Sequence, residues 1–355
     1  MTAFTDHLDL IGPDRTADGT VVAIVLVHNE ANLLPAFLDH YRAAGAPSGG
    51  TAFLIVDDRS DDGTADILAA APDVTVLRPR DGSTYKEHKR EWRSQALDRV
   101  AAGRWILAPD VDELLVWHGW PSRSLAELIG TLEAESAAAL YTVMLDMYAD
   151  APLTDHVYHG GSLTDAFPFF DCPTLDPAST WMEQAPSRFR RNWPIPAMHV
   201  LGGMRQRLFS DEAPTAMARI ARRLHRRWNH RPGSTAHVSA GLWRGLTRSR
   251  GAMPPLNLTK VPLVRWQTGL RFYGGAHAMN RVLPLGSERG VLLHFPITRG
   301  LEGLEYVTGR GQHADGSAYY RRLLGRAAVS PFYPGSRRLR SMSDLEQVFG
   351  TGGPA

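Results

Sequence analysis

Short runs of apolar residues, rich in β-branched side chains, recur along the first hundred residues of the chain. Each is four to seven residues long and has no polar alternation, which is typical of strands buried on both faces of a sheet. The runs are VVAIVLV (21–27), AFLIV (52–56), VTVL (74–77) and RWILA (104–108). The pattern therefore predicts four buried strands in this part of the chain.

Longer amphipathic stretches lie between these runs. In EANLLPAFLDHYRAAG (30–45), apolar residues return at helical spacing and Gly45 provides a stop. Residues 64–71, which Thr64 can cap, and residues 85–103 are the next two expected helices. A β-α-β-α-β-α-β order predicts an α/β fold with a mostly parallel, doubly wound, Rossmann-like sheet.

The second half of the chain has a different pattern. From about residue 150, periodicity weakens and Pro, Gly, Trp and Arg become frequent, so we expect an irregular α+β half. The expected division is a polar leader (1–19), an α/β nucleotide-binding domain (20–150), a site-completing and acceptor-binding region (151–330) and a C-terminal tail (331–355).

Composition narrows the class of protein. The chain has 355 residues, 43% of them apolar and 21% charged, as in ordinary globular proteins. A net charge of +2 does not indicate a nucleic-acid partner. Because Cys172 is the single cysteine, no intrachain disulfide is possible, which favours a reducing compartment. With no signal-peptide pattern and no apolar run near 20 residues, we expect a cytoplasmic protein without a transmembrane segment.

Acidic and polar groups follow three of the four expected strands. HNE (28–30) comes after the first, DDRSDDGT (57–64) after the second and PDVDE (109–113) after the fourth. In a doubly wound sheet, ligands bind beyond the carboxyl ends of the strands, so these groups should meet at one edge. An ordinary strand-to-helix turn would also explain residues 57–64. Asp57 and Asp58 leave the strand first, and one of them should face the ligand.

The segment WILAPDVDELLVW (105–117) carries the candidate metal chemistry. On an extended turn, Asp110 and Asp112 would point to the same side and reach one cation. Hard oxygen ligands suit Mg²⁺ or Mn²⁺, which often bridge to substrate phosphates. An acidic surface turn is the alternative.

These motifs, in this order, resemble the nucleotide-sugar domain of family 2 glycosyltransferases, in the branch whose metal motif is D-x-D-E. The resemblance covers residues 20–116, and four later segments also resemble that branch: GGMRQRLF (202–209), LTKVPLVRW (258–266), GGAHAMN (274–280) and VLLHFP (291–296). It implies the glycosyltransferase A fold, a nucleotide-diphosphate sugar donor, a divalent metal and inversion at the anomeric carbon. Uridine as the base is expected from the family alone.

The resemblance assigns residues to the donor and the metal. It places His28, Asn29 and Glu30 where the first strand meets the nucleotide, and Asp58, ahead of Asp57, at the base. It places Asp110 and Asp112 in the metal and diphosphate motif, with Asp112 as the direct metal ligand. Glu113 extends this motif to D-x-D-E.

His294, after the apolar run GVLL, corresponds to a late histidine that can complete the metal or diphosphate site. An imidazole ligand would favour Mn²⁺. A buried histidine at a strand end is the alternative.

Positive side chains are needed because the departing nucleoside diphosphate gains negative charge. The candidates are Lys86, Lys89, Arg93, Arg205, Arg207 and Lys260. In GMRQRLF the alternation predicts a strand with Arg205 and Arg207 on one face, which would suit a phosphate clamp. A solvent-facing strand side is the alternative.

Inversion also requires a carboxylate that takes the proton of the acceptor hydroxyl. The acid pair that many family members carry in the second half has no clean copy here. Glu183 is the first candidate for this catalytic base, and Asp165, Asp171 and Glu288 are its rivals.

The sequence does not identify the acceptor: a glycan or polysaccharide, a lipid-linked sugar, a protein or a small molecule would all fit. The basic run at 219–231 is either a solvated helix face or a contact with an anionic membrane surface. Two other functions remain as alternatives, a catalytically idle relative that binds nucleotide sugars and an aspartate-nucleophile phosphatase. The second fits less well, because Leu114 stands where such phosphatases carry Thr or Val.

Overall fold

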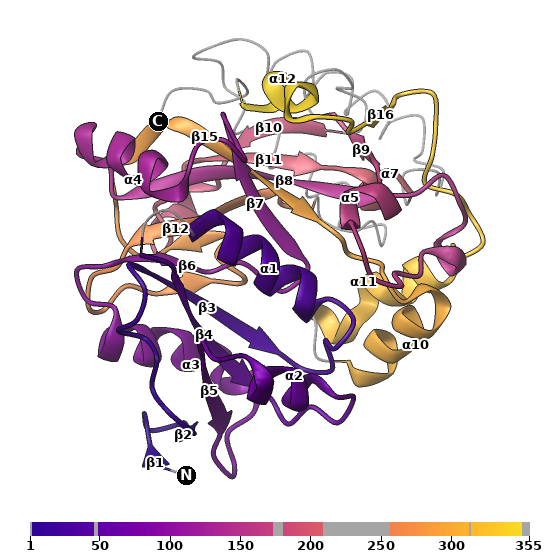
Figure 1. The fold of residues 1–355 in the computed structure, drawn as a ribbon. Coiled ribbons are helices and arrows are strands. Elements are labelled where there is room, and N and C mark those ends of the chain that lie inside the picture. The colour runs from indigo at the N-terminus through magenta and orange to yellow at the C-terminus, as the bar shows by residue number, and fades with distance from the viewer. Residues whose placement is uncertain (1, 46–48, 173–179, 209–255, 312–313, 350–355) are drawn as a thin grey trace.

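The computed structural model describes residues 2–45, 49–172, 180–208, 256–311 and 314–349. Its centre is a sheet of twelve strands (Figure 1). In chain order these are β1 (Thr2–Ala3), β2 (Leu8–Ile11), β3 (Val21–Val27), β4 (Thr51–Asp57), β5 (Val74–Pro79), β6 (Trp105–Leu107), β7 (Glu113–Trp117), β8 (Ala139–Tyr148), β9 (Phe169–Asp171), β12 (Thr259–Arg265), β15 (Leu285–His294) and β16 (Ser336–Arg338). Two small antiparallel pairs stand apart from this sheet, β10 (Thr180–Gln184) with β11 (Met198–Gly202) and β13 (Phe272–Tyr273) with β14 (Ala278–Met279).

The four predicted strands form the parallel part of the sheet. They lie in the order β5-β4-β3-β6, and β3 runs parallel to both β4 and β6. Beyond β6, β12 is antiparallel to its neighbours β6 and β8. β15 then runs parallel to β8 and antiparallel to β7. The predicted α/β class is confirmed, as a mixed sheet with a parallel core.

Helices cover both faces of this sheet. They are α1 (Leu34–Gly45), α2 (Thr64–Ala70), α3 (Tyr85–Val100), α4 (Leu125–Ala134), α5 (Leu163–Ala166), α6 (Ser187–Arg190), α7 (Met204–Leu208), α10 (Gly300–Arg310), α11 (Ala314–Leu324) and α12 (Glu346–Phe349), with 3₁₀ turns at Leu153–Asp155 and Met342–Leu345. None of the helices in the described residues is long and apolar enough to cross a membrane.

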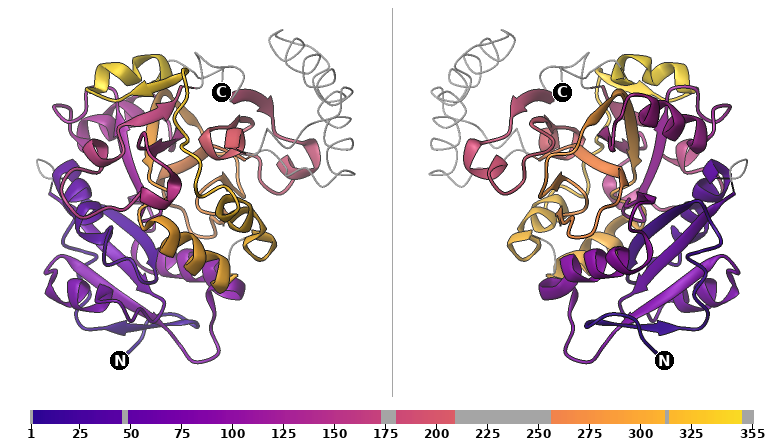
Figure 2. Two further views of the ribbon diagram at one scale, coloured as in Figure 1. Left: turned by 90° about the vertical axis from the view of Figure 1, so that its right-hand side faces the viewer. Right: turned by 90° about the vertical axis from the view of Figure 1, so that its left-hand side faces the viewer.

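The two faces of β3 show why the strand is apolar throughout. Ala23 and Val25 belong to the same buried cluster as the apolar side of α1, whereas Val22 and Ile24 pack with Trp92 of α3. Successive side chains of a strand point to opposite faces. In a strand that is covered on both faces, every side chain is therefore buried and apolar residues are favoured throughout. Figure 2 shows α10 and α11 at the end of the sheet where the site described below lies.

Two expectations about chain organisation differ from the structure. The first 19 residues were expected to form a polar leader, but β2 lies within them and pairs with β5, which extends the sheet. Leu8 is fully buried, so this segment contributes to the core. In addition, β12 and β15 come from the predicted 151–330 region yet enter the same sheet as the first domain. The site therefore forms within one continuous sheet.

Candidate functional site

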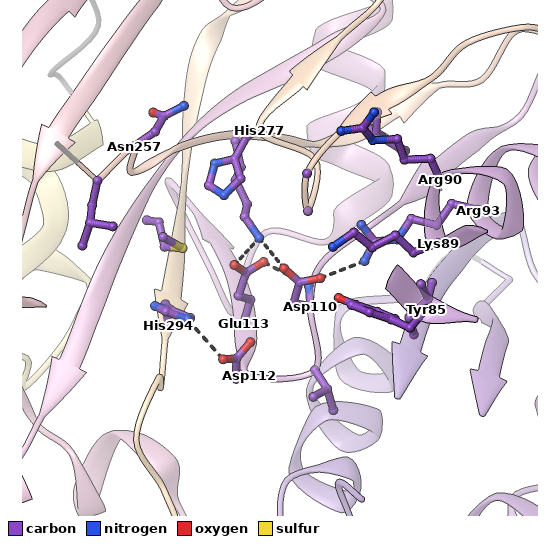
Figure 3. A pocket seen from close by; sticks show the side chains of 18 of the residues that line it. Tyr85, Lys89, Arg90, Arg93, Asp110, Asp112, Glu113, Asn257, His277 and His294 are labelled. Carbon is purple, nitrogen blue, oxygen red and sulfur yellow. Dashed lines mark hydrogen bonds and ion pairs between the residues drawn. The ribbon is translucent and has the colours of Figure 1, made fainter. Parts of the chain in front are cut away.

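A pocket of about 440 Å³ opens where β3 and β6 end. Glu30 follows β3, Asp110 and Asp112 follow β6, and all three line this pocket, as the sheet-edge argument predicted. Figure 3 shows Asp110, Asp112 and Glu113 on its floor, with His277 and His294 approaching from other strands and loops. The pocket thus combines acidic groups from the first half of the chain with residues from the second.

Asp112, Glu113 and His294 form a compact group. One ligand atom from each lies within 4.8 Å of the others. His294 ends β15 and Glu113 begins β7, and the antiparallel register pairs these two residues directly. His294 Nε2 lies 3.1 Å from a carboxylate oxygen of Asp112. Two carboxylates and one imidazole are a suitable donor set for Mn²⁺, so the residues present fit the predicted metal.

The acids around His294 decide its charge. Burial alone would lower the pKa of His294, but Asp112 and a hydrogen bond with Asp146 raise it to about 9. A cation bound by Asp112 and Glu113 would replace the proton on Nε2 as the positive charge at this position.

Asp110 takes a different position from the one predicted. Its carboxylate accepts from Lys260 Nζ at 2.6 Å and from Arg93 at 2.8 Å, and Lys260 also pairs with Glu113. These two cations hold the pKa of Asp110 well below its usual range, although burial alone would raise it. Asp110 and Asp112 do not point together, because residues 110–113 form a turn closed by the Glu113 N–H on the Asp110 carbonyl. Within the described residues, Glu113 rather than Asp110 joins Asp112 and His294.

The loops after β3 and β4 hold each other by hydrogen bonds. His28 Nδ1 lies 2.7 Å from the Asp58 carbonyl, and the Asn29 backbone N–H donates to the Ser60 hydroxyl. Asp57 is buried and accepts from the Ser60 backbone N–H, so it fixes the turn. Asp58 has one carboxylate oxygen 3.0 Å from Arg59, within its own loop.

The other carboxylate oxygen of Asp58 lies 3.2 Å from Arg310. Arg310 ends α10, so this ion pair connects the expected base-binding acid to the last part of the chain.

Glu30 lies deeper in the site. Burial and the nearby Asp112 charge raise its pKa to about 8, despite the opposing charges of Arg299 and Arg310. The raised pKa favours the protonated carboxyl group near neutral pH, and this form can donate a hydrogen bond.

The cationic side of the pocket comes mainly from one helix. Lys89 and Arg93 of α3 line the pocket as predicted, and so does Arg90, which was not predicted. Lys89 and Arg90 form no ion pair with a carboxylate in the part of the chain that the structure describes; they stack on Tyr85 and Tyr273 instead. Lys86, on the same helix, is exposed and does not line the pocket.

The strand predicted around Arg205 and Arg207 was wrong. These residues lie in α7, where positions two apart point in different directions because each residue turns the helix by about 100°. Arg205 lines the pocket and pairs with Asp146 at 2.9 Å. Arg207 instead pairs with Asp171 at 2.9 Å, away from the pocket-lining residues. The two arginines therefore do not form one clamp.

The candidate bases fall outside the pocket or outside the described side chains. Glu183 belongs to β10, but its side chain lies outside the described residues, as does the basic run 219–231. Asp165 is exposed on α5. Asp171 accepts from Tyr148 at 2.6 Å as well as from Arg207, and Glu288 pairs with Arg123 at 2.7 Å. None of these last three acids lines the pocket.

Sequence patterns missed several residues that line the pocket, among them Tyr85, Asn257, His277 and Tyr320. His277 had a local signal, the two glycines that precede it in GGAHAMN. Its loop must pass close to Asp110, because any side chain at Gly275 would collide with that carboxylate.

No family model and no curated protein matches this chain. Solved structures similar to it include mannosyltransferase PcManGT from Pyrobaculum calidifontis in complex with GDP-Man and Mn²⁺, at 22% identity over 42% of this chain and 45% of that one, with a TM-score of 0.26. A TarS fragment (1–349) from S. aureus is 13% identical, over 86% and 69%, with a TM-score of 0.32. Mannosyl-3-phosphoglycerate synthase from Rubrobacter xylanophilus is 19% identical, over 42% and 45%, with a TM-score of 0.24.

The chain thus spans less than half the length of the first and third of these proteins. With every TM-score below 0.5, these likenesses do not establish a family.

Proposed function

We propose that this protein is a metal-dependent, inverting glycosyltransferase that moves a sugar from a nucleotide-diphosphate donor, expected to be UDP-linked, to a hydroxyl acceptor. One observation carries the proposal: a compact Asp112–Glu113–His294 group shares one pocket with the positive side chains of α3. A divalent cation needs carboxylate ligands, and a diphosphate needs positive side chains that are not already paired, so a site for both needs this combination. The sequence resemblance to family 2 glycosyltransferases supports the same function.

Each part of the pocket has a role in this reaction. Asp112, Glu113 and His294 would hold the cation, which supplies charge stabilisation to the leaving diphosphate. Lys89 and Arg90 have no carboxylate partner among the described residues, so their charge is available to phosphate oxygens. Asp58 lies at the nucleotide edge and can accept a base N–H once Arg310 moves from its oxygen. Lys260 lowers the pKa of Asp110 and opposes the rise that burial causes in the pKa of Glu113.

Calorimetric titration with UDP and GDP, each with and without Mn²⁺, tests the proposal. We expect one nucleotide to bind tightly only when Mn²⁺ is present. Asp112→Asn should abolish this metal-dependent binding while circular dichroism shows an intact fold. Asp165→Asn is the matched control, because Asp165 is exposed and outside the pocket. If Asp112→Asn binds as the wild type does, the metal assignment is wrong.

A catalytically idle nucleotide-sugar-binding relative is the second candidate. The observation that favours it is that none of Asp165, Asp171 and Glu288 lies in the pocket. Such a protein would bind free nucleotide with Mn²⁺ but would not cleave any nucleotide-sugar donor. The test is to incubate a high concentration of the protein with UDP-glucose, UDP-N-acetylglucosamine and GDP-mannose and to measure the nucleotide formed. A glycosyltransferase forms nucleotide from one of these donors, whereas an idle relative forms none.

A further inference from the structure

The loop Gly274–His277 brings an unassigned histidine into the donor pocket. It connects β13 to β14, and Gly274, Gly275 and His277 all line the pocket. The loop packs tightly on the charged cluster: a Cβ at Gly275 would also lie 3.0 Å from Lys260 Nζ. His277 lines the pocket, and Figure 3 shows its side chain there together with Asp110 and Glu113.

The structure settles which nitrogen of His277 carries a proton. Nδ1 lies 2.8 Å from the Thr259 carbonyl oxygen. A carbonyl can only accept, so Nδ1 must be the protonated nitrogen of the ring. Nε2 then has a free lone pair, and it has no hydrogen-bond partner among the residues that the structure describes.

The surroundings keep this imidazole neutral. Burial and the Lys260 ammonium lower the pKa of His277 to about 3. An anionic diphosphate in the same pocket would raise the proton affinity of the ring, because a nearby negative charge favours the imidazolium. The ring is thus unprotonated before the donor binds and becomes more basic with the donor in place.

The carboxyl groups that line the pocket are less suited to accept a proton. Asp110 and Glu113 share Lys260, and Asp112 faces His294. Burial and the Asp112 charge raise the pKa of Glu30 to about 8. Both nitrogens of His294 face carboxylates. Of the two histidines that line the pocket, His277 is therefore the one with an uncommitted nitrogen among the described residues.

We propose that His277 is the general base of the transfer reaction, with Nε2 taking the proton of the acceptor hydroxyl. This inference rests on the proposed function. As the acceptor O–H bond breaks, its proton goes to Nε2 and the oxygen forms the new bond to the anomeric carbon. The bond from that carbon to the phosphate oxygen breaks, and the electron pair leaves with the nucleoside diphosphate. The imidazolium then returns its proton to solvent.

His277→Gln tests the base, since glutamine can still donate to the Thr259 carbonyl but cannot take a proton. The control is His159→Gln, an exposed histidine that does not line the pocket. Nucleotide affinity with Mn²⁺ is measured by calorimetry, and donor cleavage with water as acceptor by nucleotide release from UDP-glucose, UDP-N-acetylglucosamine and GDP-mannose. We expect affinity within threefold of the wild type and cleavage slower by about 100-fold or more.

The outcomes separate the two claims. Cleavage at the wild-type rate in His277→Gln would overturn the base and leave the proposed function standing. A loss of affinity as large as the loss of rate would also overturn it, since it would show a contact with the donor. If the wild type binds no nucleotide, the proposed function itself fails.

A second measurement does not depend on turnover or on the variant. Diethyl pyrocarbonate acylates unprotonated imidazole nitrogens, and peptide mass mapping locates the product. We expect modification of His277 in the wild type at pH 6, and protection when UDP and Mn²⁺ are present. An unreactive His277, or one that reacts equally with the nucleotide bound, would contradict a free Nε2 facing the donor site.

Discussion

His294 Nδ1 lies 2.7 Å from a carboxylate oxygen of Asp146, on the opposite side of the ring from Asp112. Asp146 is buried in β8 and its second oxygen accepts from Arg205 at 2.9 Å. A carboxylate fixed in this way orients the imidazole and directs Nε2 towards the cation position. Asp146 is therefore a supporting residue of the candidate metal group without being one of its ligands.

Asp146→Asn should weaken Mn²⁺ binding by about 10- to 100-fold, because the amide no longer stabilises the proton on Nδ1 as a carboxylate does. Titration of free Mn²⁺ by electron paramagnetic resonance measures this directly. Asp66→Asn, an exposed change in α2, is the control. Equal Mn²⁺ affinity in Asp146→Asn and the wild type would show that His294 does not take part in metal binding.

Lys260→Met should destabilise the fold by about 3–5 kcal/mol, since it leaves the buried carboxylate of Glu113 without its cation and removes one of the two cationic partners of Asp110. Urea denaturation followed by circular dichroism gives the change. Lys86→Met is the control: this exposed lysine should cost no more than about 0.5 kcal/mol. A Lys260→Met protein as stable as the wild type would mean that Lys260 and Glu113 are not buried together in solution.

His40 should make stability depend on pH. Burial lowers its pKa to about 4 from 6.5, although its hydrogen bond to the Leu115 carbonyl opposes the shift. Because the pKa is lower in the folded state, the stabilisation is complete above pH 6.5 and is lost as pH falls towards 4. The free energy of unfolding should decrease over that interval by at most about 1.4 kcal/mol per pH unit. Urea denaturation at each pH gives the free energy of unfolding of the wild type and of His40→Gln. The variant should show a smaller dependence of this free energy on pH between 6.5 and 4, and an equal dependence would exclude His40 as its source.

Gly275→Ala should impair the site without unfolding the protein. The added Cβ would collide with the Asp110 carboxylate and press on Lys260, so the loop that carries His277 must move. We expect metal-dependent nucleotide binding to fall by tenfold or more, measured by calorimetry. Gly309→Ala in α10 is the matched control, because nothing lies within 4 Å of its Cβ position. Full binding by Gly275→Ala would show that the loop shifts at no cost.

The parallel core was predictable because its signal is local. A run such as Val21–Val27 has no polar residue, which is typical of a strand covered on both faces. The rule that polar groups after parallel strands meet at one edge also predicted that Asp112 follows β6 there, and Asp112 lines the pocket. Helix boundaries were also close: residues 85–103 were expected and Tyr85–Val100 is observed.

What the sequence could not show depends on contacts between distant segments. GMRQRLF alternates like a strand, but Arg205 pairs with Asp146 and the segment coils into α7. Asp110 forms an ion pair with Lys260 because β12 runs beside β6, and no residue near position 110 in the sequence indicates that neighbour. The basic atom of His277 depends on a backbone carbonyl at Thr259. No periodicity predicts such a pairing.

The position of β12 has a consequence for how the protein is made. This strand fills the gap between β6 and β8, yet it is synthesised more than a hundred residues after both. Until it leaves the ribosome, the nascent chain carries two open, apolar strand edges that can pair with other chains. A truncation before Thr259 should therefore aggregate rather than yield a small nucleotide-binding protein. Lys260 arrives with this strand, so the charged cluster of Lys260, Asp110 and Glu113 can assemble only once β12 has been synthesised.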